Sequence, residues 1–203
     1  MNKKLLAAIL SLCLMLSLLP TAALASGLEP NEPEPSEQSS NSLSDGTSID
    51  STSNITRAQM AEMIYEHPSL NADIDTMAMG GAEPDFNDIG SCTDDQKAAI
   101  TALYRAKILS GTTETTFDPT GTVTRGEFAV VLWRATGSRS NKTAMEGQFT
   151  DTLEIWYAPA VNCFYGAGLV SGTAEGTFDG GTEISVAGVN TFLTAYAANK
   201  DMV

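Results

Sequence analysis

Positive charge is scarce in this sequence. Eleven lysine and arginine residues stand against 25 aspartate and glutamate residues in a chain of 203, which gives a formal net charge of −14. Nucleic-acid binding depends on lysine and arginine side chains that neutralise phosphates, so this charge excludes a nucleic-acid-binding protein. The acidity by itself identifies no other partner.

Histidine is almost absent, which bears on catalysis. The one histidine, His67, falls on the apolar face of a predicted helix, and the sequence has no Gly-x-Ser-x-Gly elbow to present a catalytic serine. Two carboxylates can cleave a glycoside, but no pair stands out among the 25 acids. A secreted hydrolase is therefore the weakest interpretation, and we expect a non-catalytic protein.

The sequence indicates no metal site and no cofactor, and it is poor in cysteine. Four acids cluster in one region: Asp85, Asp88, Asp94 and Asp95. They lack the spacing and the closing glutamate of a calcium-binding loop, so we expect a solvated acidic loop. Outside the amino-terminal run only Cys92 and Cys163 remain, too few for a disulfide scaffold. A disulfide and two buried thiols both stay open.

Long apolar runs are absent except at the amino terminus. There Lys3 and Lys4 precede an apolar run over 5–19, and Ala23-Leu24-Ala25 follows as a small-x-small cleavage pattern. This arrangement predicts a secretory signal over residues 1–25, removed before Ser26. The run is shorter than the ~20 residues of a membrane-spanning helix, although a retained anchor is the alternative. We therefore expect export, with no transmembrane segment after cleavage.

Residues 26–54 contain no aromatic and no basic residue but many serines, prolines and acids. Such a composition buries too little apolar surface to offset the entropy of ordering, and it predicts a disordered linker. The remaining domain, residues 55–198, repeats itself: the segment 109–118 matches 170–179 at an offset of 61. We divide it into a partial repeat at 55–67 and repeats at about 86–137 and 149–198.

The most informative pattern is the start of the last helix in each repeat. Thr56, Thr124 and Ser185 are suitable N-cap residues, and Gln59 and Glu127 complete capping boxes in the first two copies. An apolar residue before each cap faces one in the first turn, which makes a hydrophobic staple. The helices that follow share an apolar stripe with i, i+3, i+4, i+7 spacing: Met60, Met63, Ile64 and His67; Phe128, Val131, Leu132 and Ala135; Val189, Phe192, Leu193 and Tyr196. Three such stripes predict three helices around a pseudo-threefold axis.

Arg57 and Arg125 do not fit a purely structural interpretation. Each occupies the first helical position, where the positive end of the helix dipole disfavours a cation. A helix start beside a guanidinium favours binding of a carboxylate; the alternative is an arginine in solvent or paired with a neighbouring acid. On this view, replacing Arg125 with alanine leaves stability unchanged or slightly higher.

Together these residues resemble the S-layer homology family of bacterial surface proteins. The motifs are a Phe-x-Asp at 86–88 and 149–151, a Gly-terminated turn at 108–111 and 168–172, and Thr-Arg-Gly-Glu at 124–127, with Thr-Arg-Ala-Gln at 56–59. The resemblance implies an all-α, three-pronged spindle of three repeats. It also implies grooves that bind an acidic, commonly pyruvylated, secondary cell-wall polysaccharide at the cell surface, and these site residues: Thr56, Arg57, Gln59, Gly111, Thr124, Arg125, Glu127, Trp156 and Gly172.

The departures from the family pattern carry their own expectations. Val186 and Gly188 replace the arginine and glutamate in the third copy, so we expect its groove to be silent. Asp95 stands where the third copy has Trp156, and residues 67–85 form an unusual spacer. A degenerate repeat that binds another protein is the alternative function.

Overall fold

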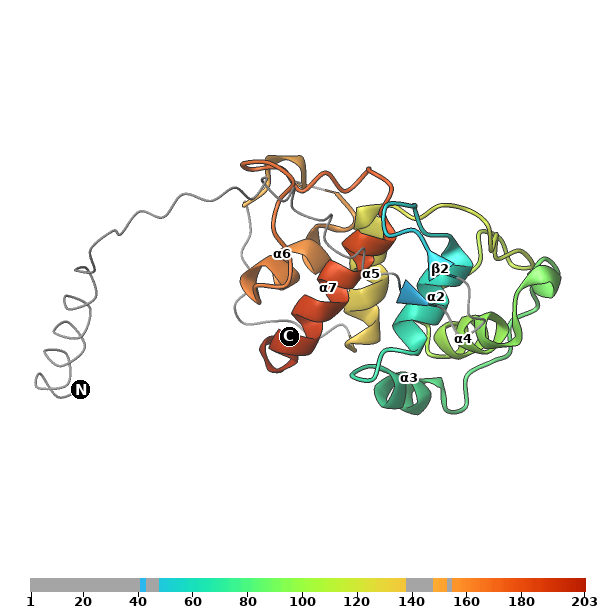
Figure 1. The fold of residues 1–203 in the computed structure, drawn as a ribbon. Coiled ribbons are helices and arrows are strands. Elements are labelled where there is room, and N and C mark those ends of the chain that lie inside the picture. The colour runs from blue at the N-terminus through green and yellow to red at the C-terminus, as the bar shows by residue number, and fades with distance from the viewer. Residues whose placement is uncertain (1–40, 43–47, 138–147, 153–154) are drawn as a thin grey trace, which may run out of the picture. The chain divides into compact units, whose positions relative to one another are not determined.

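The computed structural model describes residues 41–42, 48–137, 148–152 and 155–203 (Figure 1). The predicted signal at 1–25 and most of the predicted linker lie outside these ranges. Within them the secondary structure is α-helical: α2 (Arg57–Tyr65), α3 (Asn71–Ala78), α4 (Asp94–Arg105), α5 (Arg125–Ala135), α6 (Ala158–Gly166) and α7 (Val186–Asn199). Short 3₁₀ turns complete it: η1 (Ile89–Ser91), η2 (Thr150–Thr152) and η3 (Lys200–Met202). The all-α prediction is confirmed.

One small strand pair precedes the helices. The two-residue strands β1 (Asn41–Ser42) and β2 (Ser48–Ile49) pair antiparallel, with Asn41 opposite Ile49. No helix in the described part of the chain is both long and apolar enough to cross a membrane.

The predicted helix starts form as expected. Thr56 accepts a hydrogen bond from the Gln59 amide, Thr124 accepts one from the Glu127 amide, and both capping boxes are complete. In the third copy Ser185 caps α7 by accepting from the Gly188 amide at 3.2 Å. Each cap satisfies a backbone donor that the first turn leaves unpaired, so the three starts are fixed locally.

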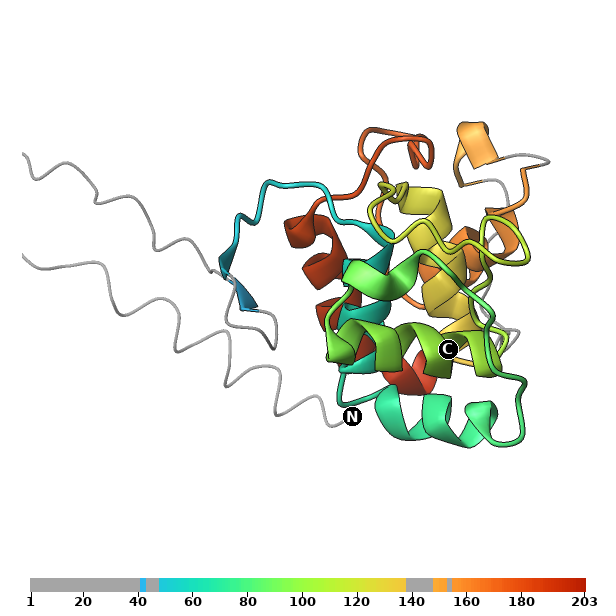
Figure 2. The same ribbon diagram turned by 90° about the vertical axis from the view of Figure 1, so that its right-hand side faces the viewer.

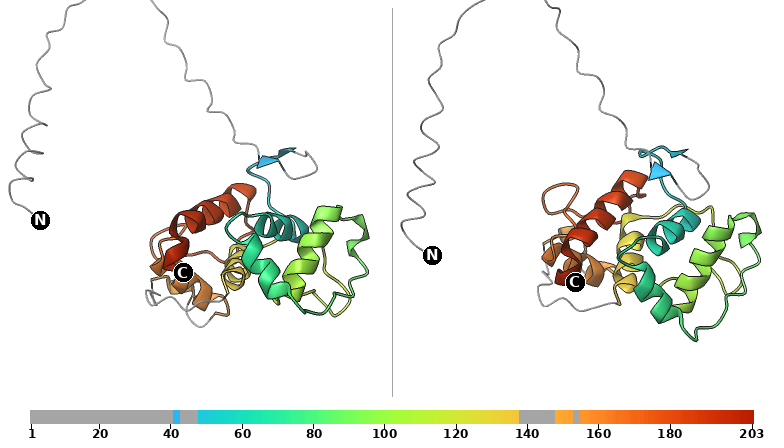
Figure 3. Two further views of the ribbon diagram at one scale, coloured as in Figure 1. Left: turned by 90° about the horizontal axis from the view of Figure 1, so that it is seen from below. Right: turned by 60° about the horizontal axis from the view of Figure 1, so that its bottom comes forward.

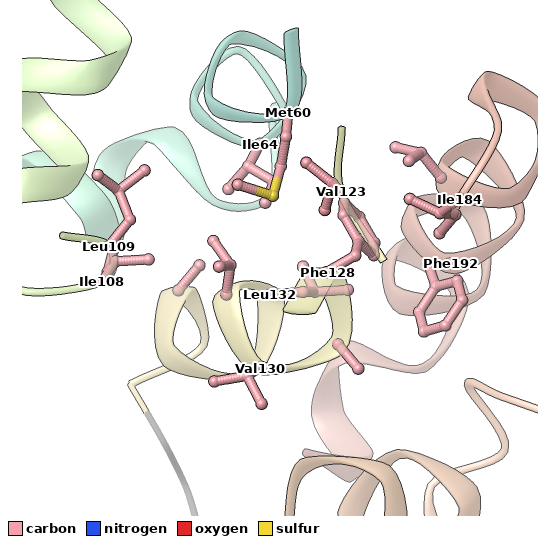
Figure 4. Packing of buried hydrophobic residues seen from close by; sticks show 14 of the residues in the cluster. Met60, Ile64, Ile108, Leu109, Val123, Phe128, Val130, Leu132, Ile184 and Phe192 are labelled. Atoms are coloured by element: carbon pink, nitrogen blue, oxygen red, sulfur yellow. The ribbon is translucent and has the colours of Figure 1, made fainter. Parts of the chain in front are cut away.

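The apolar stripes form a shared core (Figure 4). Ten of the twelve stripe positions are buried, and Met63 and His67 are partly exposed. All six residues of the three staples are at most 1% exposed: Ile55, Met60, Val123, Phe128, Ile184 and Val189. Phe128 of α5 meets Phe192 of α7 edge to face, with ring centroids 5.3 Å apart. The predicted seam is therefore the centre of the core.

The caps also close a ring of backbone pairing. Three isolated antiparallel bridges connect the segments before α2, α5 and α7, each segment to the other two: Asn54 with Ser185, Thr56 with Thr122, and Thr124 with Glu183. The Ile55 amide donates to the Ile184 carbonyl at 3.0 Å, and the Ile184 amide donates to the Val123 carbonyl at 2.8 Å. This cyclic pattern is the pseudo-threefold arrangement that the sequence predicts.

Of the three helices that bear the apolar stripes, α2, α5 and α7, the first two each pack against a helix of the next repeat. α2 packs mainly against α4, and α5 against α6. α3, which belongs to the unusual spacer, lies alongside α4 (Figures 2 and 3). α7 contacts no other described α-helix as extensively. The helix equivalent to α4 and α6 would belong to the first half of the first copy, which the sequence lacks.

The domain begins before residue 55. Ser51 and Ser53, assigned above to the linker, accept hydrogen bonds from the Ala187 and Val186 amides at 2.9 and 3.0 Å. In the other copies the equivalent acceptors are the carbonyls of Pro119 and Gly121, and of Gly180 and Thr182. The predicted linker therefore extends four residues too far. Composition does not reveal that residues 51–54 belong to the domain, because they contribute backbone carbonyls, which any residue type supplies.

Candidate functional site

The Phe-x-Asp motifs hold the loops beside the site. Asp88 accepts from the Phe117 amide at 2.9 Å through Oδ1 and from the Asp118 amide at 2.7 Å through Oδ2. Asp151 accepts from the amides of Phe178 and Asp179 at 2.9 and 2.7 Å. Each carboxylate thus holds the loop before the next helix start. Asp88, one of the four clustered acids, therefore has a structural role.

The hydrogen bonds to Asp88 predict a pH dependence of stability. Burial raises the pKa of the Asp88 carboxyl, but hydrogen bonds from Phe117 and Asp118 outweigh it and hold this pKa below its ordinary 3.8. The stabilisation is therefore present above about pH 4 and is lost as the pH falls through the lowered pKa. Asp88→Asn should reduce the free energy of unfolding by ~1–2 kcal/mol at pH 7. Urea unfolding should show a smaller difference from wild type at pH 2.5.

The control for this measurement is Asp85→Asn, which removes an exposed carboxylate three residues earlier. It should leave stability nearly unchanged at both pH values. An Asp88→Asn deficit of the same size at low and neutral pH would mean that the charge of Asp88 contributes nothing.

Arg57 spans two repeats. Its Nε donates to the Phe117 carbonyl at 2.9 Å and its Nη2 donates to the Ser110 carbonyl at 3.0 Å. The guanidinium carbon lies 4.7 Å from the centroid of the Phe117 ring, over the ring face. In the described residues Nη1 has no acceptor within hydrogen-bonding distance, so one end of the cation stays available to a ligand.

Arg125 repeats this geometry one copy later. Its Nε donates to the Phe178 carbonyl at 3.2 Å, and its guanidinium carbon lies 4.8 Å from the Phe178 ring centroid. The centroid of the Phe192 ring lies 5.7 Å from the same carbon. Both arginines therefore bring a positive charge to the boundary between one repeat and the next.

These contacts correct the expectation that replacing Arg125 with alanine leaves stability unchanged or slightly higher. Carbonyl acceptors and an aromatic face offset the unfavourable helix dipole, so replacement by alanine should destabilise the domain. Burial lowers the pKa of Arg57, while Glu127, Asp118 and Asp88 act to raise it. Burial also lowers the pKa of Arg125, opposed by Asp179. Both guanidinium groups nevertheless remain charged at neutral pH.

A groove of about 280 Å³ lies beside Arg57. It combines four of the predicted site residues, Arg57, Gly111, Glu127 and Trp156, with residues of the 109–112 turn and of α5. We call this the Arg57 groove: Arg57, Met60, Leu109, Ser110, Gly111, Thr112, Val123, Glu127, Val130, Val131, Arg134 and Trp156. A cation, a carboxylate and an indole ring that is 61% exposed make it a polar cleft with an aromatic wall.

An equivalent cleft of about 310 Å³, the Arg125 groove, lies one repeat later. It is lined by Arg125, Gly168, Leu169, Val170, Ser171, Gly188, Thr191, Phe192 and Ala195. Gly188 stands where the Arg57 groove has Glu127, so each groove joins the arginine of one repeat to the helix start of the next. The loss of glutamate in the third copy therefore alters the Arg125 groove. Val186, which replaces the third arginine, is 1% exposed in the core.

The remaining predicted site residues have local structural tasks. Thr56, Gln59 and Thr124 make the capping boxes, and Glu127 Oε2 also accepts from Thr124 Oγ1 at 3.0 Å. A side chain at Gly111 would collide with carbonyls of its own turn and with a phenylalanine ring, and the same holds at Gly172. Gly172 is not among the residues that line the Arg125 groove.

Trp156 is positioned through its neighbour. The Tyr157 ring packs against Gly126, where a Cβ atom would lie 2.5 Å from Tyr157 Cδ1. Trp156 meets Tyr157 edge to face with centroids 5.4 Å apart. Gly126, a departure from the alanine of the family motif, therefore makes room for the ring that holds Trp156 at the groove.

Other candidates do not form a site. Burial lowers the pKa of His67, and its Nδ1 accepts from the Ser69 amide at 3.3 Å. Cys92 and Cys163 are both buried and are not joined by a disulfide. In the described ranges no three histidine, cysteine or acidic residues are grouped closely enough to hold a metal ion. A cavity of about 740 Å³ between α3 and α4 is lined by none of the predicted site residues.

Comparison with known proteins identifies the repeat. Residues 85–129 and 148–185 match the family model described as "S-layer homology domain". The chain is 35% identical over 79 residues to an endoglucanase of Bacillus sp. (strain KSM-635), across 39% of this chain and 8% of that protein. It is 34% identical over 91 residues to the exoglucanase XynX of Acetivibrio thermocellus, across 44% of this chain and 8% of that protein.

A third relative is the endo-1,4-beta-xylanase A of Thermoanaerobacterium saccharolyticum, 35% identical over 80 residues, across 39% of this chain and 7% of that protein. This chain thus spans less than a tenth of the length of these relatives. The two matched segments overlap the second and third copies of the repeat. Domains of this family anchor proteins at the cell surface and are not catalytic. These matches support assigning the second and third copies of the repeat to the S-layer homology domain family.

Proposed function

We propose that this chain is a non-catalytic module that attaches to an acidic secondary cell-wall polysaccharide through the Arg57 and Arg125 grooves. The observation that carries the proposal is the repeated arginine, held at the boundary of successive repeats beside an open cleft. The proposal also requires export, which the amino-terminal 25 residues predict.

The chemistry of the grooves supports a sugar acid as ligand. A guanidinium binds a carboxylate through charge-assisted hydrogen bonds; the Arg57 groove offers Arg57 and Arg134, and the Arg125 groove offers Arg125. In the Arg57 groove Trp156 adds an exposed aromatic face, which suits the apolar face of a pyranose ring. Glu127 lies in the same groove and would accept from sugar hydroxyls.

The relatives support attachment rather than catalysis. The three described above are named as enzymes that act on glucans or xylan, and the matching segment is at most 8% of each. A segment so small in enzymes of different substrates is better suited to a common attachment role than to their chemistry.

The test is retention of the purified mature chain, residues 26–203, on isolated wall sacculi. We expect it to sediment with intact sacculi and to stay in solution once the secondary polysaccharide has been chemically removed. Binding that survives polysaccharide removal but is lost after protease treatment of the sacculi would contradict the proposal. That result would favour the alternative, a module that binds another surface protein.

A further inference from the structure

A second pocket adjoins the Arg57 groove and is rich in cations. It measures about 280 Å³ and is lined by Ala82, Tyr104, Arg105, Lys107, Leu109, Ser110 and Arg134. We call it the basic pocket. It shares Leu109, Ser110 and Arg134 with the Arg57 groove, so the two hollows are adjacent. Three cations around one small pocket are unexpected in a chain of net charge −14.

Lys107 adopts a backbone conformation that disfavours it. Its φ is +59°, and the equivalent residue one repeat later is Gly168, with φ +73°. Both follow a helix and make the same bond: the Lys107 amide donates to the Tyr104 carbonyl at 2.9 Å, and the Gly168 amide to the Tyr165 carbonyl at 3.0 Å. Glycine adopts this conformation without strain. A lysine retained here calls for a role that glycine cannot fill.

The other two cations are also specific to this copy. At the repeat offset of 61, Arg105 corresponds to Gly166, Lys107 to Gly168 and Arg134 to Ala195. Gly168 and Ala195 line the Arg125 groove, so that groove has no cation at the positions equivalent to Lys107 and Arg134. The comparison between repeats thus shows that these three cations occur in the second copy and not at the equivalent positions of the third.

The spacer before the second copy builds the outer side of this pocket. Gly81 approaches the Arg105 backbone so closely that a side chain there would overlap it, and the next residue, Ala82, lines the pocket. Glu83 pairs with Arg105 at 3.1 Å, between Oε1 and Nη1. The connection between α3 and α4 therefore contributes Ala82 to the wall of the pocket.

Two of the cations have charge available for a ligand. Arg134 Nη1 donates to the Ile108 carbonyl at 3.3 Å, which fixes the guanidinium at the wall between the two hollows. In the described part of the chain no carboxylate lies within 4.0 Å of the Lys107 ammonium. The negative end of the α4 dipole favours Arg105 and Lys107, and that of α5 favours Arg134 in its last turn. The dipoles do not explain why the three cations line one pocket.

We propose that the basic pocket is a second anion subsite, which takes an acidic group on the sugar next to the one in the Arg57 groove. The inference rests on the proposed function, since the two hollows would be filled by one glycan chain. Its chemistry suits a ketal-linked carboxylate or a phosphomonoester substituent, flanked by the Tyr104 ring. The module would then recognise two successive acidic units, a more demanding requirement than one.

The test compares Lys107→Gly with wild type for binding to purified wall polysaccharide. We expect affinity to fall about ten-fold, its salt dependence to weaken, and the melting temperature not to fall, because Gly168 shows that glycine fits. The matched control is Lys200→Ala, which removes the same charge from an exposed terminal position. It should bind as wild type does.

Different failures are distinguishable. Unchanged affinity of Lys107→Gly, while Arg57→Gln binds poorly, would overturn the subsite and leave the proposed function intact. Unchanged affinity of both variants would overturn the proposed function as well. Mild acid removes ketal-linked carboxylates and a phosphatase removes phosphomonoesters; the Lys107→Gly difference should vanish after one treatment, which identifies the acidic group. A difference that persists after both would also overturn the subsite.

Discussion

Replacing Leu132 with alanine is expected to lower the free energy of unfolding of the helical domain by ~2–5 kcal/mol. Leu132 is completely buried at the centre of the seam, where the surrounding helices cannot collapse to fill the cavity. Its equivalents are Ile64 of α2 and Leu193 of α7, which are 0% and 6% exposed. The loss should appear as a fall in melting temperature of ~2–4 °C per kcal/mol for a domain of this size.

The matched control is Thr194→Ala on α7. Thr194 is exposed, and its replacement should change the free energy of unfolding by no more than ~0.5 kcal/mol. Chemical denaturation of both variants at neutral pH measures the difference. A Leu132→Ala variant within that same margin would show that the three stripes do not share a core.

The helix starts could be predicted from sequence because the causes are local. A threonine three residues before a glutamine or glutamate satisfies backbone donors within one turn, and an apolar residue on each side of it closes the staple. Thr56 and Thr124 behave as this pattern predicts. The threefold arrangement could be predicted from the repetition, because three equivalent apolar stripes are all buried when the three helices pack against one another.

The composition of the grooves could not be predicted in the same way. The sequence grouped Arg125 with Glu127, which belong to one motif, whereas the structure places Glu127 in the Arg57 groove. This pairing depends on how successive repeats meet, which no local pattern encodes. The carbonyls of Phe117 and Ser110 that hold Arg57 were also missed, because any residue type offers a carbonyl.

The spacer shows a third kind of limit. Residues 67–85 match no part of the repeat, so the resemblance said nothing about α3 or about Ala82, which lines the basic pocket. Lys107 and Arg134 were likewise passed over, because each is an ordinary surface residue until the repeats are superposed position by position. A comparison between the copies would have revealed them, because glycine and alanine stand at the equivalent positions 61 residues later.

The double variant Arg57→Gln/Arg125→Gln is expected to lose most binding to wall sacculi. Each arginine would contribute a charge-assisted hydrogen bond worth ~1.5–3 kcal/mol, which corresponds to about ten- to 100-fold in affinity for each groove. Glutamine keeps part of the side-chain length and one donor group, so it disturbs the contacts with Phe117 and Phe178 less than alanine would. Circular dichroism should confirm that the variant is folded at the temperature of the binding assay.

The arginines have two roles in this structure, and the assay must separate them. Each holds two repeats together and each presents charge to a groove, so a loss of binding alone does not distinguish a missing ligand contact from a displaced loop. Arg57→Lys/Arg125→Lys keeps the charge but loses the planar fork; if the charge recruits the polymer, this variant should bind better than the glutamine variant at equal stability. A folded glutamine variant that binds as wild type does would limit the arginines to joining the repeats. The Lys97→Gln/Lys200→Gln variant, with the same change in net charge, should bind normally, because neither lysine lines a groove.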